Sequence, residues 1–250
     1  MSEAGRAAGR PGRYFAAALR FARTTGHTGI DVSAGGGRSA PRKKGANTMC
    51  GRYQFSARQS ADLLRIAQDV QRRSGEGAQL PLPDGDVHPA QRAPVLVCRG
   101  GKVMSELQTW GLPGPNGRLI INARAETVTQ KSLFRRSIAA RRCVVPATAF
   151  YERDAARRAY TFSLPDNPLW LAGIYDNVDG EDRFVILTTA PNASVSPIHD
   201  RMPLTLARID IRPWLTDPEA ALALLATTPP LLERQAQDGQ MGMEEFLNSR

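Results

Sequence analysis

The stretch "RCVVPATAFYERDAARRAYTFSLPDNPLWLAGIYDNVDGEDRFVILTT" (residues 142–189) decides the fold. It holds four short runs rich in aliphatic and aromatic residues, which begin at Arg142, Ala159, Leu169 and Arg183. Residues that favour turns, chiefly Pro, Asp, Asn and Gly, separate these runs. Short apolar runs with such boundaries are typical of β-strands. The stretch therefore predicts a succession of strands with no long helix among them.

The residues upstream of this stretch continue the same pattern. Further β-rich runs are "APVLVC" (93–98), "VMSELQTW" (103–110) and "RLIIN" (118–122), and the Gly- and Pro-rich residues 75–86 predict a loop. Many short strands with few long helices favour an α+β fold. We therefore expect a single domain in which a curved, barrel-like mixed β-sheet is flanked by helices.

Three helices are expected around this sheet. Ser56 can cap a helix that runs to about Arg72, because apolar residues recur there near a 3.6-residue period. Residues 130–140 predict a second helix that returns the chain to the strand at 142. Asp217 followed by Pro218 is a typical helix start and predicts a third.

The positive charge of the chain is concentrated in its first 48 residues. The 250 residues carry a formal net charge of +9, of which +7 lies in residues 1–48 and +2 in residues 49–250. Residues 1–48 are rich in Gly, Ala, Arg and Ser, which predicts a disordered basic extension. It could be upstream sequence translated from a miscalled start, a nucleic-acid-binding arm or a targeting peptide. We favour the miscalled start, because composition changes abruptly at an internal Met, and assign the folded domain to residues 49–250.

The cysteines and the hydropathy exclude several classes of protein. The three cysteines, Cys50, Cys98 and Cys143, have spacings that fit neither a zinc site nor a disulfide framework. We therefore expect a reduced, intracellular protein without a metal or another cofactor. No apolar stretch is long enough to span a bilayer, so membrane functions are excluded.

Cys50 is the first candidate for chemistry. If Met49 is removed, Cys50 presents an α-amine and a thiol on adjacent carbons, with ordinary pKa values of about 8 and about 8.5. Such an aminothiol can condense with an aldehyde to a Schiff base, and the sulfur can then close a thiazolidine ring. An internal cysteine cannot do this, because its nitrogen is an amide. The alternative for Cys50 is a small buried apolar side chain, as we expect for Cys98 and Cys143.

Three further segments carry polar side chains suited to catalysis or to binding. In "INARAET" (121–127), Asn122, Arg124 and Glu126 alternate and could share one face of an extended segment. Glu152 follows two aromatic residues, which favours partial desolvation and use as a general acid or base. His199 lies in a Pro-bounded turn beside charged residues, where it could transfer protons. Each of these residues equally fits an ordinary place on a solvated surface.

Taken together, these segments resemble a known family. The SRAP family (SOS response-associated peptidases, also called abasic-site processing proteins) has similar motifs in the same order from Met49 to about Leu206. The motifs are "MCGRY", "WGL", "NARAET", "RCVVPATAFYE", "LAGIY", "TTA" and "IHDRMP". The resemblance implies one α+β domain that binds single-stranded DNA and links its N-terminal cysteine to the ring-opened sugar of an abasic site. It also implies a role in the DNA damage response and loss of the initiator Met by autoproteolysis. We expect a monomer in the cytoplasm, associated with the bacterial nucleoid.

The resemblance also implies roles for individual residues. Cys50 is the nucleophile, Asn122 orients it, Glu152 moves protons at the sugar, and His199 assists formation and reversal of the Schiff base. Two basic residues, Arg52 and Arg124, bind the phosphates that flank the lesion.

This chain departs from the family pattern at several places. Residues 86–91 read "DVHPAQ" where the family usually has Asn-x-Ala-Pro, so a loop near the site is changed. Residues 113–118 replace a segment with a tryptophan, and Arg153 stands where a tryptophan is usual after "FYE".

Two other functions are compatible with the sequence. A non-catalytic single-stranded DNA-binding protein would bind intact and abasic strands equally, with affinity falling as salt rises. A conventional cysteine peptidase would use Cys50 and His199 and would cleave peptides in trans.

Overall fold

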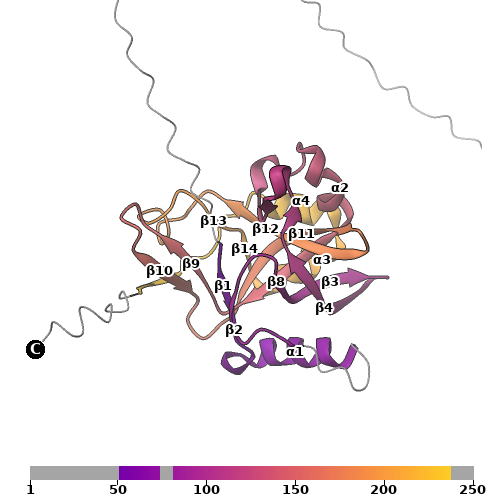
Figure 1. Cartoon of the computed structure of the whole chain (residues 1–250), viewed down its shortest axis with the longest axis horizontal. Helices are drawn as coiled ribbons and strands as arrows, with labels where there is room; N and C mark the ends of the chain where they lie inside the picture. The colour runs from indigo at the N-terminus through magenta and orange to yellow at the C-terminus, as the bar shows by residue number, and fades with distance from the viewer. Residues whose placement is uncertain (1–50, 74–80, 238–250) are drawn as a thin grey trace, which may run out of the picture. The chain divides into compact units, whose positions relative to one another are not determined.

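A computed structural model describes residues 51–73 and 81–237 of the chain (Figure 1). All of these residues belong to one compact unit. Cys50, the extension over residues 1–48 and the first part of the expected loop at 75–86 lie outside the described residues.

Within the described residues, five strands close into a barrel. Strand β12 pairs with β4 on one side and with β11 on the other, and β3 and β8 complete the ring. The pairing of β12 with β4 is parallel and the other pairings of the ring are antiparallel, so the sheet is mixed. The expected barrel-like mixed sheet is thus confirmed. The barrel strands are β3 (Arg92–Arg99), β4 (Lys102–Trp110), β8 (Arg142–Ala147), β11 (Leu169–Val178) and β12 (Glu181–Thr189).

Shorter strands extend the barrel sheet and form two others. β7 (Asn122–Arg124) and β13 (Met202–Pro203) pair with β12, β14 (Thr205–Leu206) pairs with β11, and β5 (Leu112–Pro113) pairs with β6 (Leu119–Ile120). A five-stranded antiparallel sheet has the order β15-β10-β9-β1-β2. Its strands are β1 (Tyr53–Phe55), β2 (Gly85–Val87), β9 (Ala149–Arg153), β10 (Ala159–Ser163) and β15 (Glu233–Ala236).

Helices cover the barrel from two directions (Figure 1). The helix α1 packs against β3 and β4, whereas α2 packs against β8 and β11 and α3 against β8 and β3. The second and third expected helices are confirmed, and the Asp217 side chain accepts hydrogen bonds from two backbone N–H groups of α4. The α-helices are α1 (Ala61–Arg73), α2 (Ser132–Ala140), α3 (Ile211–Thr216) and α4 (Pro218–Leu224).

The first expected helix starts later than its sequence suggested. Ser56 precedes only a 3-10 turn, η1 (Ala57–Gln59), and its hydroxyl donates to Asp84 Oδ1 instead of capping a helix. The cap of α1 is Ser60, whose Oγ accepts from the backbone N–H of Asp62 over 3.2 Å. Both serines have an extended backbone and differ in their side-chain partners: the Ser56 hydroxyl donates to Asp84, whereas Ser60 Oγ accepts from a backbone N–H of α1.

Aromatic packing attaches the five-stranded sheet to the barrel. The ring of Tyr53 in β1 meets the Trp110 ring edge-on with centroids 5.2 Å apart, and Trp110 stacks on Phe184 of β12. All three side chains are fully buried, and Trp110 Nε1 donates to the Ile121 carbonyl. The start of β1, which follows Cys50 in the chain, is therefore held firmly on the barrel.

The helices of residues 51–73 and 81–237 include none that is long and apolar enough to cross a membrane.

Candidate active site

Sheet pairing brings the start of β1 beside the end of β9. The two strands are antiparallel, with Tyr53 opposite Phe150, and the Tyr151 N–H donates to the Arg52 carbonyl. The same register, continued by two residues, sets Gly51 opposite Glu152. The residue bonded to Cys50 is therefore placed across from a predicted catalytic carboxylate.

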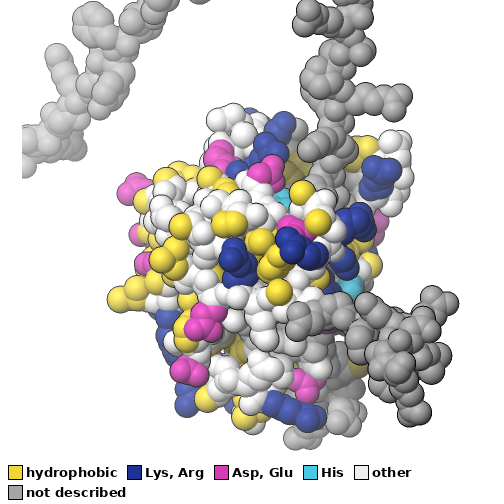
Figure 2. All heavy atoms as spheres, turned by 90° about the vertical axis from the view of Figure 1, so that its left-hand side faces the viewer, with side chains coloured by type: hydrophobic (Ala, Val, Ile, Leu, Met, Phe, Trp, Pro, Cys, Tyr) yellow, Lys and Arg dark blue, Asp and Glu magenta, His cyan; other side chains and the backbone are white. Residues whose placement is uncertain are grey.

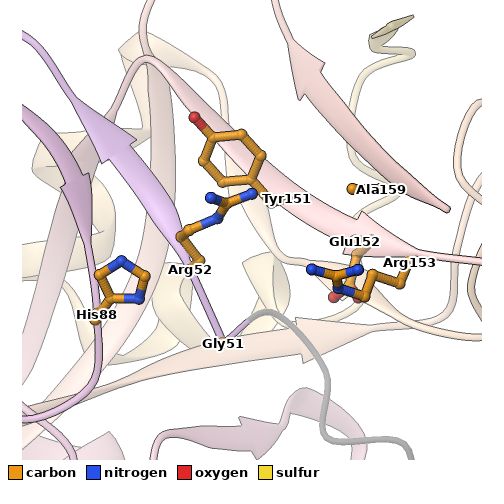
Figure 3. Close-up of a pocket in the computed structure, with 7 residues that line it drawn as sticks. All are labelled: Gly51, Arg52, His88, Tyr151, Glu152, Arg153 and Ala159. Carbon is orange, nitrogen blue, oxygen red and sulfur yellow. The ribbon is translucent and has the colours of Figure 1, made fainter. Parts of the chain in front are cut away.

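A cavity of about 360 Å³ lies at this junction (Figure 3). Its lining includes Gly51 and Arg52 ahead of β1, His88 after β2, and a run of three residues on β9. The β9 residues are Tyr151, Glu152 and Arg153.

Glu152 and His199 form a buried acid–base pair. The distance between Glu152 Oε2 and His199 Nε2 is 3.9 Å, and the side chains are only 6% and 3% exposed. Ionisable groups withdrawn from water and set against each other are typical of functional sites. The separation exceeds a direct hydrogen bond of about 3.2 Å, so a polar atom of a bound molecule could contact both groups. The fold thus unites two of the predicted catalytic residues.

The hydrogen bonds of His199 define where its proton lies. The backbone N–H of Arg201 donates to His199 Nδ1 over 3.1 Å. Asp200 Oδ1 is also 3.1 Å from Nδ1, but that side chain is 88% exposed and could accept only from a protonated Nδ1. Because the backbone N–H has no alternative but to donate, we assign the neutral ring its hydrogen on Nε2, facing Glu152.

Arg52 belongs to a network on the other side of the cavity. Its guanidinium lies over the Tyr151 ring, 3.8 Å from the centroid, and Nη1 donates to Asp86 Oδ2 over 2.9 Å. Tyr151 donates its hydroxyl to the other oxygen of Asp86 over 2.8 Å, and Arg52 Nη2 donates to Gln237 Oε1. Burial and the Asp86 carboxylate raise the pKa of Tyr151 to about 12, so the phenol stays protonated at neutral pH. The changed loop at 86–91 therefore does lie at the site.

Asn122 and Arg124 come from a different strand. Both belong to β7, which runs parallel to β12 with Asn122 opposite Ile186 and Arg124 opposite Thr188. The Oδ1 atom of Asn122 is buried, whereas Arg124 is exposed. Side chains two residues apart on a strand point to the same side of the sheet.

Glu126 does not continue that face. The extended segment ends at Arg124 and a 3-10 turn, η3 (Ala125–Thr127), follows. Glu126 instead accepts two hydrogen bonds from the Arg201 guanidinium, at 2.6 and 2.8 Å. Those hydrogen bonds hold the pKa of Glu126 below its ordinary value despite partial burial.

The residues that sequence reasoning missed are Asp86 and Arg201. Both were visible as charged residues, Asp86 in the changed loop and Arg201 in "IHDRMP", but their partners lie 34 and 75 residues away in the chain.

No cluster of three or more His, Cys, Asp or Glu side chains suited to a metal occurs in the described ranges. Figure 2 shows Lys and Arg side chains on the same face of the molecule as histidine atoms.

The fold and the site together define a class of protein: a mixed β-barrel that carries a buried Glu–His pair beside its first strand. The chain belongs to the SOS response associated peptidase (SRAP) family, whose model matches residues 49–239.

Individual relatives agree with this membership. The chain is 31% identical over 197 residues to the abasic site processing protein YoaM of Bacillus subtilis, covering 71% of this chain and 85% of that one. It is 32% identical over 170 residues to YoqW of the same organism, also named an abasic site processing protein, covering 58% and 76%. A crystal structure of a Bacteroides thetaiotaomicron protein superimposes with a TM-score of 0.59 at 23% identity, over 77% of this chain and 94% of the other. This last likeness supports the fold.

Proposed function

We propose that this protein processes abasic sites in DNA by forming a covalent thiazolidine between Cys50 and the lesion. The observation that carries the proposal is the buried Glu152–His199 pair, whose Glu152 lines the same cavity as Gly51. Cys50 lies outside the described residues and is bonded directly to Gly51 in the chain. Family membership and the names of the relatives support the choice of lesion.

The chemistry requires Cys50 to be N-terminal. An abasic site in its ring-opened form has an aldehyde carbon, C1′. The Cys50 amine adds to C1′, and loss of one water gives a Schiff base. The Cys50 thiolate then adds to the same carbon, and a proton goes to the nitrogen, which closes a five-membered thiazolidine. No oxidant or cofactor enters these steps, and the ring diverts the Schiff base from β-elimination.

Glu152 and His199 supply the proton transfers in this scheme. Glu152 takes a proton from the attacking amine and returns one to the hydroxyl that leaves as water. His199, with its Nε2 hydrogen directed toward Glu152, donates to the sugar oxygen during formation and reversal of the Schiff base. Asn122, whose Oδ1 atom is buried, orients the Cys50 amine.

The basic residues hold the DNA. Arg52 lines the cavity and Arg124 is exposed at the end of β7, and both bind phosphates that flank the lesion. Single-stranded DNA is the expected substrate, because the sugar is then reached without the cost of opening a duplex.

The decisive experiment uses protein that begins at Cys50. It is incubated with a single-stranded oligonucleotide that contains one abasic site, and the products are separated on a denaturing gel. We expect a covalent adduct, no stable adduct with Cys50→Ala, and a rate about 100-fold lower with Glu152→Gln, as for loss of a general acid or base. Cys98→Ala is the matched control, because this half-buried thiol lies in β3 of the barrel.

The other two functions are distinguished by the same material. Equal affinity for intact and abasic strands without an adduct would establish a binding protein. Cleavage of peptides in trans, lost in Cys50→Ala, would establish a peptidase.

A further inference from the structure

The structure contains an ion pair, Glu126–Arg201, and the backbone N–H of its arginine donates to His199 of the acid–base pair. We propose that Glu126 and Arg201 are positioning residues: they hold the Arg201 backbone N–H against His199 Nδ1 and so keep the His199 hydrogen on Nε2. The role in catalysis rests on the proposed function, whereas the effect on the histidine does not.

Arg201 is fixed by several hydrogen bonds at once. Its two terminal nitrogens bind the two oxygens of Glu126, and Nη2 also donates to the Thr188 carbonyl over 2.6 Å. The Arg201 side chain is only 15% exposed. Parallel N–H donors that match a carboxylate define both the position and the plane of a guanidinium, which a lysine cannot do. Arg201 is thus immobilised well beyond what an ordinary surface ion pair achieves.

The partners of Arg201 belong to the rigid part of the molecule. Thr188 is in β12 of the barrel, and Glu126 is in η3, directly after β7, which also pairs with β12. The ladder of β13 begins only at Met202, so the backbone N–H of Arg201 lies just before it. The pairing of β13 therefore does not fix the position of the Arg201 backbone N–H. The hydrogen bonds of the Arg201 side chain to the barrel do.

This constraint has a chemical consequence at His199. A neutral imidazole has one nitrogen that donates a hydrogen bond and one that accepts. The hydrogen-bond partner of one nitrogen therefore determines whether the other nitrogen carries the hydrogen. With Arg201 donating to Nδ1, the Nε2 hydrogen points to Glu152 Oε2, 3.9 Å away. If the N–H moves away, Nδ1 can carry the hydrogen and donate to Asp200, and Nε2 then faces Glu152 as an acceptor. In that tautomer His199 has no Nε2 hydrogen to donate to the sugar oxygen.

The negative charge of Glu126 is maintained by its surroundings. Arg201 lowers the pKa of Glu126 through hydrogen bonds and charge, and the positive charge of Arg124 lowers it further. Glu126 is therefore ionised at neutral pH and continues to accept the two hydrogen bonds from the Arg201 guanidinium. It also lies between a proposed phosphate-binding residue and the residue that sets the state of His199.

The direct test is the tautomer of His199. Nitrogen–proton NMR of ¹⁵N-histidine-labelled protein beginning at Cys50 distinguishes Nε2–H from Nδ1–H, and that chain holds two histidines, assigned with His88→Gln. We expect Nε2–H in the parent and a mixture of tautomers in Glu126→Gln and in Arg201→Lys, which keeps the charge but not the paired donors. The matched control is Asp62→Asn, since Asp62 likewise accepts two hydrogen bonds from one guanidinium, that of Arg208, far along the chain.

The kinetic test measures the rate of adduct formation across pH 5–9. We expect Glu126→Gln and Arg201→Lys to slow the reaction about tenfold to a hundredfold, as for a misplaced catalytic group, and to change the shape of the pH–rate profile. Asp62→Asn should do neither, and affinity for intact single strands should separate positioning from phosphate binding by Arg201.

The outcomes are separable. Nδ1–H in the parent, or an unchanged Nε2–H signal in both folded variants, overturns the inference whether or not any adduct forms. Weaker strand binding with an unchanged profile would assign Arg201 to DNA instead. If the parent forms no adduct, the proposed function fails, and the NMR result still decides the positioning role.

Discussion

At the scale of single residues, Asp86 competes with DNA phosphate for the Arg52 guanidinium. We propose that Arg52 binds a phosphate, yet its guanidinium already donates to Asp86 and stacks on Tyr151. The Arg52 and Asp86 side chains are 30% and 34% exposed, so water weakens this pair without removing it. Asp86 both orients the guanidinium and offsets part of its charge.

Removing that offset should strengthen DNA binding. Asp86→Asn keeps one oxygen acceptor for Arg52, and its Nδ2 can donate to the Tyr151 hydroxyl oxygen, but the change removes the negative charge that competes with phosphate. We expect affinity for intact single-stranded DNA to rise about two- to fivefold, the value of one partly exposed ion pair, as measured by fluorescence anisotropy at fixed salt.

A neighbouring carboxylate provides the control for this change. Asp84 pairs with Arg58 on the surface and accepts from Ser56, so Asp84→Asn removes the same charge without touching Arg52. Equal gains in the two variants would mean that only net charge matters. A loss of affinity in Asp86→Asn would mean that the orientation of the Arg52 guanidinium by Asp86 contributes more to DNA binding than removal of the Asp86 charge does.

At the scale of elements, the barrel depends on close approach of its strands. Gly173 lies in the middle of β11, opposite Cys143 of β8 and Ile186 of β12. A Cβ atom at Gly173 would lie 2.8 Å from Cys143 Sγ and 3.0 Å from the Val185 carbonyl oxygen. The glycine of "LAGIY" is therefore required by packing between strands and not by an unusual backbone angle.

Gly173→Ala should destabilise the fold without altering the site. We expect the free energy of unfolding to fall by about 1–3 kcal/mol, the usual cost of overpacking a core, as measured by urea denaturation. Cys143→Ala removes the sulfur that the new methyl group would meet. The double variant should thus be more stable than the sum of the single effects predicts, whereas strict additivity would show that the sulfur contact is not the cause.

The elements that the sequence predicted best are those buried on both faces. The runs at 142–146, 169–175 and 183–189 are nearly continuous in apolar residues, and each became a barrel strand with most of those residues buried. The prediction was wrong where a short turn replaced regular structure. Ser56 introduced a 3-10 turn, and Glu126 left the extended face because η3 begins at Ala125. Hydrophobic period identifies a buried face but not such single turns.

The site was predictable only in part for a related reason. Glu152 and His199 stand in distinctive local motifs, so their type and setting could be recognised in the chain. Asp86 reaches Arg52 and Tyr151 through the pairing of β1 with β2 and β9, and nothing local signals that contact. Hydrogen bonds between residues far apart in sequence depend on sheet order, which charge patterns do not reveal.

At the scale of the whole molecule, the extension should strengthen DNA binding and at the same time block the reaction of Cys50. Residues 1–48 carry a net charge of +7, against +2 for residues 49–250. Each phosphate neutralised on a single strand contributes about −0.7 to the slope of log affinity against log salt. The full chain should therefore bind single-stranded DNA more tightly at low salt, and with a steeper salt dependence, than protein beginning at Cys50.

The same extension should abolish the chemistry. With residues 1–49 attached, the Cys50 nitrogen is an amide, which cannot form a Schiff base, so tighter binding should coincide with no thiazolidine adduct. The assay compares the full chain, verified by intact mass, with protein beginning at Cys50 and with a chain whose first 48 residues are a neutral Gly-Ser segment. The neutral segment should block the adduct without steepening the salt dependence, which separates blockage from charge. An adduct whose mass retains residues 1–49 would show that the N-terminal aminothiol is not the reacting group.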